Sequence, residues 1–288
     1  MDVSTLYEFT DAFEVTNNVK QTFDEYGYVV IRNLLNKVEL EKLKGTLEGD
    51  NARAKYGFAR DDGMGKKAKY LCWNHPGNDV TGLLARSEKV AGTFEKLLGG
   101  ELYHYHTKLI MKDAFEGGAH NWHQDYGYWY HNGCIKPDMG SVFIAVDKAD
   151  QTNGCLKIVP KSHKLGRIDH IAVGDEVGAD PERVSQILPV LPLVHAELEA
   201  GDAVFFHSNV LHRSEQNSSP NRRWAFIIAY NRADNNPVKV HHHPQYTPLN
   251  KVPNSALLNC DEVANDEGKD FFLGQSNENK SLKERTVD

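Results

Sequence analysis

The pattern of apolar and polar positions changes character near residue 100. Before that point apolar residues recur at helical spacing, most clearly at Val38, Leu40, Leu43 and Leu47. This part of the chain predicts a helix at 17–26 behind an Asn cap, a strand at 28–34 opened by Gly27, a helix at 37–48, a loop at 50–80, and a helix at 87–98 ended by Gly99 and Gly100. These helices would form an N-terminal support for the rest of the chain.

Beyond residue 100 the apolar residues gather in short runs separated by Gly, Pro, Asn and Asp. The runs lie at 102–111, 141–147, 155–159, 203–207 and 224–231. Short strands between turn signals are typical of a mainly β sandwich or barrel. The chain has no internal repeat and no alternation of strands with helices, so a doubly wound nucleotide-binding fold is excluded. We expect one domain over 1–261, with its β core at about 100–235, and a polar, partly disordered tail over 262–288.

Composition and charge narrow the class of protein. The 288 residues are 40% hydrophobic and 25% charged, as in ordinary globular proteins. The net charge of -7 argues against a nucleic-acid partner. The longest apolar run, Trp224 to Tyr230, is far shorter than the roughly 20 residues of a membrane helix. Cysteines at 72, 134, 155 and 260 form no C-x-x-C pair, and no signal peptide is visible, so the sequence predicts reduced thiols and a cytoplasmic protein.

Candidate metal ligands occur in two segments. His123 and Asp125 are two residues apart, a spacing that puts both side chains on one face of a strand, although a lone H-x-D is weak evidence. His212 follows a strong strand, and Arg223 leads into the next strand, which we expect to lie beside it. Two histidines and one carboxylate form the facial triad of non-haem Fe(II) oxygenases. An arginine suits the far carboxylate of a 2-oxo acid co-substrate, because its guanidinium makes a bidentate ion pair.

With these motifs in order, the chain resembles the phytanoyl-CoA hydroxylase family of Fe(II)/2-oxoglutarate dioxygenases. The matching segments are His123-Gln-Asp125, NGCLKIVPKSH at 153–163, and His212-Arg-Ser214 with Arg223, and the resemblance covers roughly residues 20–235. The aromatic stretch after Asp125 is also similar to ectoine hydroxylase. One departure is Lys161, where the family usually has glycine. The resemblance implies a double-stranded β-helix, or jelly-roll, core, Fe(II) as metal, and 2-oxoglutarate and O2 as co-substrates.

The resemblance also implies roles for individual residues. His123, Asp125 and His212 would be the iron ligands and the catalytic centre. Arg223, Ser214, Lys108 and Phe143 would line the 2-oxoglutarate site. Independently of the resemblance, Tyr126, Tyr128 and Trp129 directly follow a candidate ligand, so they either face substrate or pack to order the loop. The substrate class expected from the aromatic stretch is a small polar or zwitterionic metabolite, such as an amino acid derivative or aminophosphonate, with release of succinate and CO2.

Several alternatives stay open at this point. An acyl-CoA substrate is one, and a lysine cluster at 66, 67 and 69 could face it. A non-catalytic jelly-roll binding protein and a cupin-like metalloenzyme that needs no 2-oxo acid are others. His207 could replace His212, but Ser218 stands where the paired arginine is needed. His104 and His106 share one face of a strand, and His106 lines the pocket or packs in the core. The triple His241–His243 is expected in a loop, because neighbours in an extended chain point to opposite sides.

Overall fold

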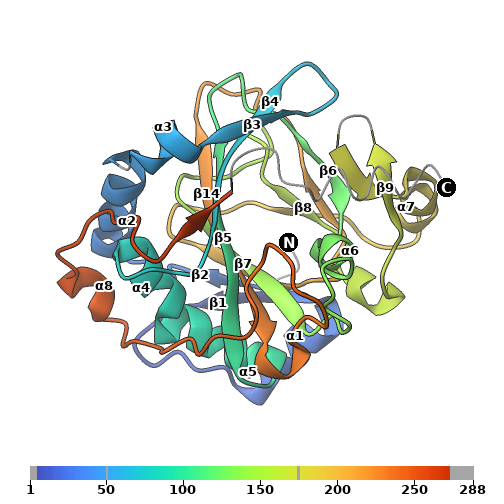
Figure 1. Ribbon diagram of the computed structural model, residues 1–288. Coiled ribbons are helices and arrows are strands. Elements are labelled where there is room, and N and C mark those ends of the chain that lie inside the picture. Colours follow the sequence, from blue (N-terminus) through green and yellow to red (C-terminus); the bar gives the residue numbers. More distant parts are fainter. Residues whose placement is uncertain (1–4, 50, 174–175, 273–288) are drawn as a thin grey trace.

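The protein is a jelly roll of two facing sheets with a helical layer on one outer side (Figure 1). The computed structural model describes residues 5–49, 51–173 and 176–272. The helices are α1 (Asn17–Tyr26), α2 (Lys37–Gly49), α3 (Ala52–Tyr56), α4 (Val80–Arg86), α5 (Thr93–Leu98), α6 (Asp125–Trp129), α7 (Pro181–Ile187) and α8 (Ala256–Asn259), with a π-helical turn at Glu88–Gly92 and 3-10 turns at Ser162–Leu165 and Ala233–Asn235. None of the helices in the described part of the chain has both the length and the apolar character needed to span a membrane.

The strands pair mostly antiparallel into a large and a small sheet. They are β1 (Leu6–Glu8), β2 (Tyr28–Arg32), β3 (Phe58–Asp61), β4 (Lys67–Asn74), β5 (Leu102–Lys112), β6 (His120–His123), β7 (Met139–Ala145), β8 (Leu156–Ile158), β9 (His170–Val173), β10 (Glu176–Ala179), β11 (Val194–Ala196), β12 (Ala203–His207), β13 (His212–Ser214), β14 (Arg223–Arg232) and β15 (Asp270–Phe271). The large sheet runs β1-β2-β12-β7-β14-β5-β4-β15, with β3 on β4. The small sheet runs β11-β8-β13-β6, and β9 and β10 form a separate hairpin.

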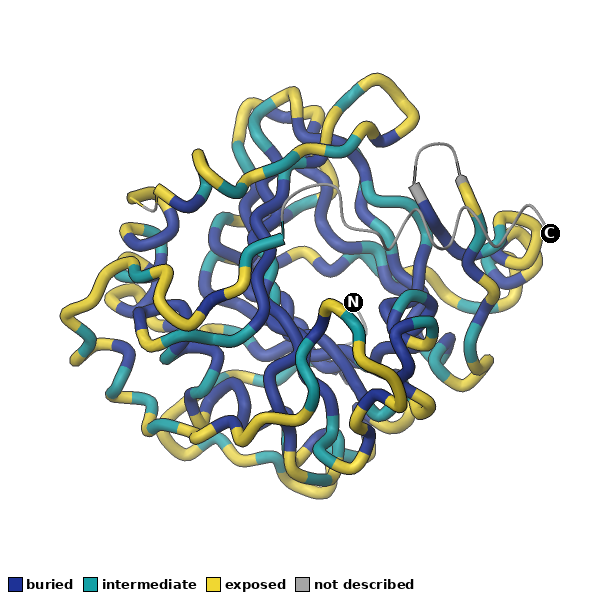
Figure 2. Tube along the Cα trace, in the orientation of Figure 1, coloured by how far each residue is buried: buried dark blue, intermediate teal, exposed yellow. Residues whose placement is uncertain are grey.

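The large sheet is buried on both faces, which explains the continuous apolar runs of its central strands. In β7, Val142 and Ile144 pack on the outer side in the cluster that also contains the helix residues Leu43 and Phe94. Phe143 and Ala145 point the other way, into a second cluster between the two sheets. Dark blue segments fill the centre of the molecule in Figure 2 accordingly. The strand runs predicted after residue 100 are therefore confirmed, and the fold class with them.

The N-terminal elements match their prediction with small differences. The helices at 17–26 and 37–48 are present as α1 and α2, but the cap of α1 is Thr16, whose hydroxyl accepts a hydrogen bond from the Val19 amide. In α2, Leu40, Leu43 and Leu47 are buried, whereas Val38 is 65% exposed. The predicted helix at 87–98 is divided into the π-helical turn and α5, and Gly99 ends α5 in the left-handed conformation.

The loop predicted at 50–80 is wrong. This segment holds α3, the β3–β4 hairpin and the start of α4. The hairpin turn is organised by Asp62, whose Oδ1 accepts hydrogen bonds from the amides of Met64 and Lys66. Because its side chains are largely charged, the hairpin had no strand-like hydrophobic pattern except at its end. Together with β1 and β2, it starts the β core well before residue 100.

The described part of the C-terminal segment packs on the core. Asp270 and Phe271 pair with β4 as β15. Lys269 forms a fully buried ion pair of 2.5 Å with Asp79, which also caps α4. Residues 273–288, the rest of the predicted tail, lie outside the described residues. The division into one domain and a partly disordered tail stays a prediction.

Candidate metal centre

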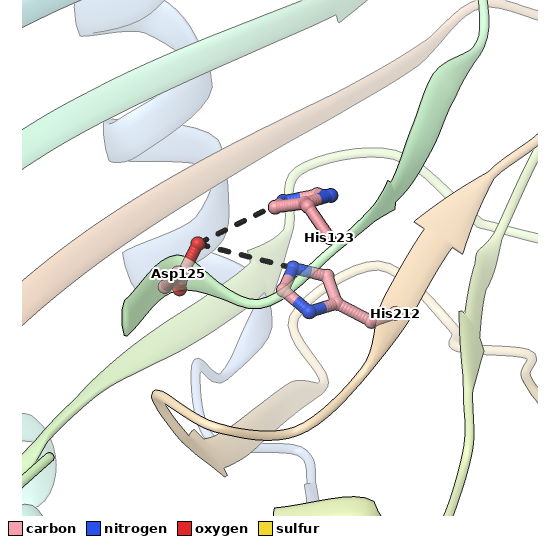
Figure 3. A group of neighbouring side chains, drawn as sticks. All are labelled: His123, Asp125 and His212. Atoms are coloured by element: carbon pink, nitrogen blue, oxygen red, sulfur yellow. Dashed lines mark ion pairs between the residues drawn. The ribbon is translucent and has the colours of Figure 1, made fainter. Parts of the chain in front are cut away.

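Three side chains converge on one point between the two sheets. Nε2 of His123 lies 3.8 Å from Oδ1 of Asp125, and Nε2 of His212 lies 4.0 Å from the same oxygen (Figure 3). One donor atom from each residue lies within 4.8 Å of the other two. Within the residues that the structure describes, this is the one group of at least three such side chains that could hold a metal ion. Two imidazoles and one carboxylate are the donor set of a non-haem Fe(II) site.

Hydrogen bonds orient each donor toward the shared point. Nδ1 of His123 donates to the carbonyl of Asn121 and Nδ1 of His212 to the carbonyl of Val210, both at 2.8 Å. A ring nitrogen that donates to a carbonyl carries the proton, so each Nε2 has a free lone pair. Ser141 donates to Oδ2 of Asp125 at 2.7 Å, which leaves Oδ1 for a metal. The three residues therefore each present one free donor atom toward the shared point.

The electrostatic environment keeps both imidazoles neutral. Burial lowers the pKa of His123 well below its usual range, and the nearby rings of His212 and His120 lower it further. Burial also lowers the pKa of His212, although Asp125 opposes this shift. A neutral imidazole is the form that binds a metal, so the site is in its ligating state at neutral pH.

The turn between His123 and Asp125 is not the strand that the sequence predicted. His123 ends β6, and Asp125 begins α6, so the two side chains converge across a strand-to-helix turn. Gln124 anchors the turn, because its side chain donates to the carbonyls of Gly166 and Asn209 and accepts from the amide of Ile168. The backbone N–H of Gln124 donates to Nε2 of His170 at 3.0 Å.

Arg223 lies at the other end of the same cavity. Its side chain is 1% exposed and makes one hydrogen bond, from Nη2 to the carbonyl of Gly154 at 2.8 Å. Its Nε and Nη1 are buried and have no hydrogen-bond partner among the described residues, and burial lowers its pKa to about 10. An uncompensated buried guanidinium is costly, so its free donors fit a carboxylate ligand such as one end of 2-oxoglutarate.

The path by which Arg223 reaches the site differs from the prediction. Arg223 begins β14 of the large sheet, whereas His212 begins β13 of the small sheet, so they face each other across the sandwich rather than on paired strands. Ser214 ends β13 and also lines the cavity. The ring of Phe143 lies 5.5 Å from the guanidinium carbon of Arg223. The structure thus brings together all the residues predicted for metal and co-substrate.

Lys108 lines this cavity as well, from the middle of β5. The cavity has a volume of about 520 Å³, including its open mouth. Its wall mixes these polar groups with apolar side chains from both sheets. The apolar members are Ile110, Phe143, Leu156, Phe206 and Ile227.

The three aromatic residues predicted to face substrate have different surroundings. Tyr128 lies 5.8 Å from the ring of His123, and its hydroxyl donates to the carbonyl of Val177. Trp129 packs 5.7 Å from His106, which lines the cavity. Tyr126 donates to the carbonyl of Cys134 in an apolar cluster and does not line the cavity. None of the three therefore lines the cavity: the rings of His123 and His106 lie between the cavity and Tyr128 and Trp129, respectively.

The remaining histidines separate into distinct environments. The sequence predicted that His104 and His106 share one face of a strand, but a β-bulge in the pairing of β5 with β14 puts them on different sides of the sheet. His104 forms a hydrogen bond with Thr107 on the helix side, and His106 lines the cavity. His207 packs against Phe23 and lies away from the metal ligands. In the triple His241–His243, which is in a loop as predicted, His243 is buried and stacks 4.9 Å from His106.

Sequence reasoning missed two residues that support the ligands. Ser141 is the inward-facing polar residue of an otherwise apolar strand, a signal that could have been noticed. His170 is joined to Gln124 by a contact across 46 residues, and no local pattern reveals it. Lys161, the departure from the family pattern, has φ +67°, which explains why glycine is common there; its ammonium pairs with Glu25 at 2.8 Å on the surface.

Comparison with known proteins agrees with this site. Residues 23–225 match the family model described as phytanoyl-CoA dioxygenase. The chain is 28% identical to L-proline trans-4-hydroxylase of Streptomyces griseoviridis, over 81% of this chain and 91% of the relative. It is 30% identical to ectoine dioxygenase of Halomonas elongata, over 74% of this chain and 69% of the relative.

Solved structures give the same fold. EctD from S. alaskensis with bound Fe has a TM-score of 0.70 at 20% identity, covering 86% of this chain and 90% of that one. EctD with 2-oxoglutarate and 5-hydroxyectoine has a TM-score of 0.69 at 20% identity and covers 88% and 93%. At this identity the likeness supports the jelly-roll fold alone.

Proposed function

The chain belongs to the phytanoyl-CoA dioxygenase family, and on this basis we propose that it hydroxylates an unactivated C–H bond of a small polar or zwitterionic metabolite. As a member of this family it is a non-haem Fe(II)- and 2-oxoglutarate-dependent dioxygenase. The reaction consumes 2-oxoglutarate and O2 and releases succinate and CO2.

The observation that carries the proposal is one cavity with two complementary ends. At one end three oriented donors, His123, Asp125 and His212, face a common point, and at the other Arg223 has unused buried donors. Fe(II) with 2-oxoglutarate supplies the oxidising chemistry, which no protein side chain can provide. A cupin that needs no 2-oxo acid would have no use for the second end, so the cupin-like alternative loses its support.

The side chains of this chain then have separate tasks. His123, Asp125 and His212 would hold the metal ion, whose chemistry needs further positions for ligands. Arg223 and Ser214 bind the far carboxylate of 2-oxoglutarate, and Phe143 packs beside that arginine. The apolar wall excludes water, which strengthens the ion pair made by Arg223.

The substrate class rests on the relatives and on the aromatic residues. L-Proline and ectoine, which name two of the relatives, are both small and zwitterionic. Tyr128 and Trp129 lie behind the rings of His123 and His106 and would shape the substrate side of the cavity, with Tyr126 supporting that wall.

We further propose that the enzyme is cytoplasmic and has no nucleic-acid partner. All four cysteines are free, three of them buried, and burial raises the pKa of Cys134 and of Cys155 to about 11. Such thiols are unreactive and suit a reducing compartment.

The test is an anaerobic titration of the metal-free protein with Fe(II) and then with 2-oxoglutarate. A visible charge-transfer band that saturates at one equivalent of 2-oxoglutarate is expected. The loaded enzyme is then given O2 with free amino acids, ectoine and acyl-CoA esters, and succinate is measured. Succinate formation with acyl-CoA esters alone would replace the proposed substrate class, and iron binding without a band would refute the co-substrate.

A further inference from the structure

Lys108 points into the cavity from the centre of β5. It lies between His106 and Ile110 on the cavity side of that strand. Its partners across the sheet are Ile227 of β14 and Cys72 of β4. Lys108 is only partly buried, so its ammonium can reach a molecule in the cavity.

The ammonium of Lys108 forms no hydrogen bond or ion pair with any residue that the structure describes. Two other cations near it have partners: Arg213, also in the cavity wall, pairs with Glu215 at 2.7 Å. Lys112, four residues further along β5, donates to the carbonyls of Gly118 and Glu215. A lysine with no partner in a cavity with apolar walls is placed to bind an anionic ligand.

The strand register separates Lys108 from the co-substrate end of the cavity. Arg223 pairs with Lys112, whereas Ile227 pairs with Lys108. Four residues of strand correspond to roughly 13 Å at about 3.3 Å per residue. Lys108 lines the cavity together with the proposed metal ligands His123, Asp125 and His212. In the proposed function Arg223 binds one carboxylate of 2-oxoglutarate and the metal would bind the other, so each already has a positive partner.

The charges of the loaded site leave one positive charge without a counterpart. Fe(II) brings two positive charges, and Arg223 and Lys108 bring one each. Asp125 brings one negative charge and 2-oxoglutarate brings two. Lys112 is not part of this sum, and its charge would increase the net positive charge of the site. Because the cavity wall is largely apolar, a substrate with one negative group would bind with a net electrostatic gain.

We propose that Lys108 binds a carboxylate of the substrate, so that the enzyme selects amino-acid-like carboxylates over their neutral or purely cationic analogues. This inference rests on the proposed function and deepens it. It differs from the sequence prediction, which assigned Lys108 to 2-oxoglutarate. The substrate carboxylate would lie on the β5 wall, where His106 also lines the cavity.

The test compares Lys108→Met and Lys108→Arg with wild-type enzyme, with Lys148→Met as control because Lys148 is exposed and pairs only with Glu199 on the surface. Anaerobic enzyme loaded with Fe(II) and 2-oxoglutarate is titrated calorimetrically with the L-amino acids, including L-proline, with ectoine, and with the matching amides, including L-prolinamide. The affinity for 2-oxoglutarate is measured separately from the charge-transfer band.

In wild type the carboxylates that bind should do so about 10- to 100-fold more tightly than their amides, as expected for a charge-assisted pair. Lys108→Met should abolish this preference and change the affinity for 2-oxoglutarate less than about threefold. Lys108→Arg should retain most of the preference, and Lys148→Met all of it.

Three results would overturn the inference. In the first, Lys108→Met weakens 2-oxoglutarate binding tenfold or more and leaves the preference for carboxylates intact. In the second, wild type binds no carboxylate of the panel or binds amides equally well. In the third, no charge-transfer band forms before any amino acid is added; this result, unlike the other two, refutes the proposed function as well.

Discussion

The hydroxyl of Ser141 donates a 2.7 Å hydrogen bond to Oδ2 of Asp125, from the strand that lies behind the proposed metal ligand. This bond fixes the carboxylate so that Oδ1 faces His123 and His212. Outer contacts of this kind orient metal ligands and hold the ligand oxygen in place before the metal arrives. The role of Ser141 can be tested without touching a ligand.

Ser141→Ala should weaken Fe(II) binding by about 10- to 100-fold and leave the fold intact, because only the orienting bond is lost. The measurement is an anaerobic Fe(II) titration together with a thermal melt of the metal-free protein. Ser185→Ala removes an exposed hydroxyl on α7 and is the matched control. Unchanged Fe(II) affinity in Ser141→Ala would show that Asp125 needs no such support.

The metal ligands were predicted from the sequence by motif and resemblance, not by geometry. The spacing of His123 and Asp125 suggested one strand, whereas the structure has a strand-to-helix turn held by Gln124. Arg223 was expected on a strand beside His212, yet it reaches the cavity from the opposite sheet. In both cases the structure brings the predicted residues into one cavity, but their arrangement depends on tertiary contacts that a single sequence does not contain.

The same distinction holds for the fold. Strands such as β7 and β12 could be predicted because both their faces are buried and their sequences are continuously apolar. The β3–β4 hairpin could not, because it alternates charged residues at the edge of the sheet. The bulge that separates His104 from His106 was equally hidden, since it arises from pairing with β14.

Arg223→Met should raise the dissociation constant of 2-oxoglutarate at least about 100-fold, because the far carboxylate loses a buried guanidinium. The free energy of unfolding of the ligand-free protein should not fall and can rise, since an uncompensated buried charge is removed. Thermal melts with and without 2-oxoglutarate measure both effects. A variant that melts at lower temperature yet is stabilised by 2-oxoglutarate as much as wild type would contradict the assignment.

The stability of the protein should fall on acidification below about pH 6.5. Burial lowers the pKa of His207 to about 3, with smaller contributions from His163 and Lys20. In the unfolded chain a histidine titrates near pH 6.5, so the unfolded state binds more protons as the pH falls through the window from about 6.5 to about 3. Each such histidine lowers the free energy of unfolding by up to about 1.4 kcal/mol per pH unit in that window.

His207→Asn tests this dependence. Asparagine can accept the hydrogen bond that the Asn209 amide now donates to Nδ1 of His207, and it does not titrate. Between pH 7 and pH 5, denaturant unfolding should show a smaller loss in the free energy of unfolding for the variant than for wild type. The difference should not exceed the contribution of one histidine, which is up to about 1.4 kcal/mol per pH unit. An equal loss in both proteins would mean that His207 is not the titrating group.

Gly127, in the first turn of α6, allows His170 to pack directly on the backbone beside the proposed metal ligand Asp125. A Cβ atom at Gly127 would overlap the imidazole of His170. That ring donates from Nδ1 to the carbonyl of Ile168 and accepts at Nε2 from the Gln124 amide, so it cannot move without breaking the bonds that hold the turn.

Gly127→Ala should therefore destabilise the protein by about 1–3 kcal/mol, the usual cost of overpacking, and weaken Fe(II) binding because Asp125 moves with the turn. Gly45→Ala is the matched control, since an added Cβ on the exposed face of α2 meets no atom within 4 Å. That control should stabilise the protein by up to about 1 kcal/mol, because alanine favours the helix. Both free energies come from denaturant unfolding, and Fe(II) affinity from titration. If Gly127→Ala lost stability but kept full Fe(II) affinity, His170 would support the fold alone and would have no part in positioning Asp125.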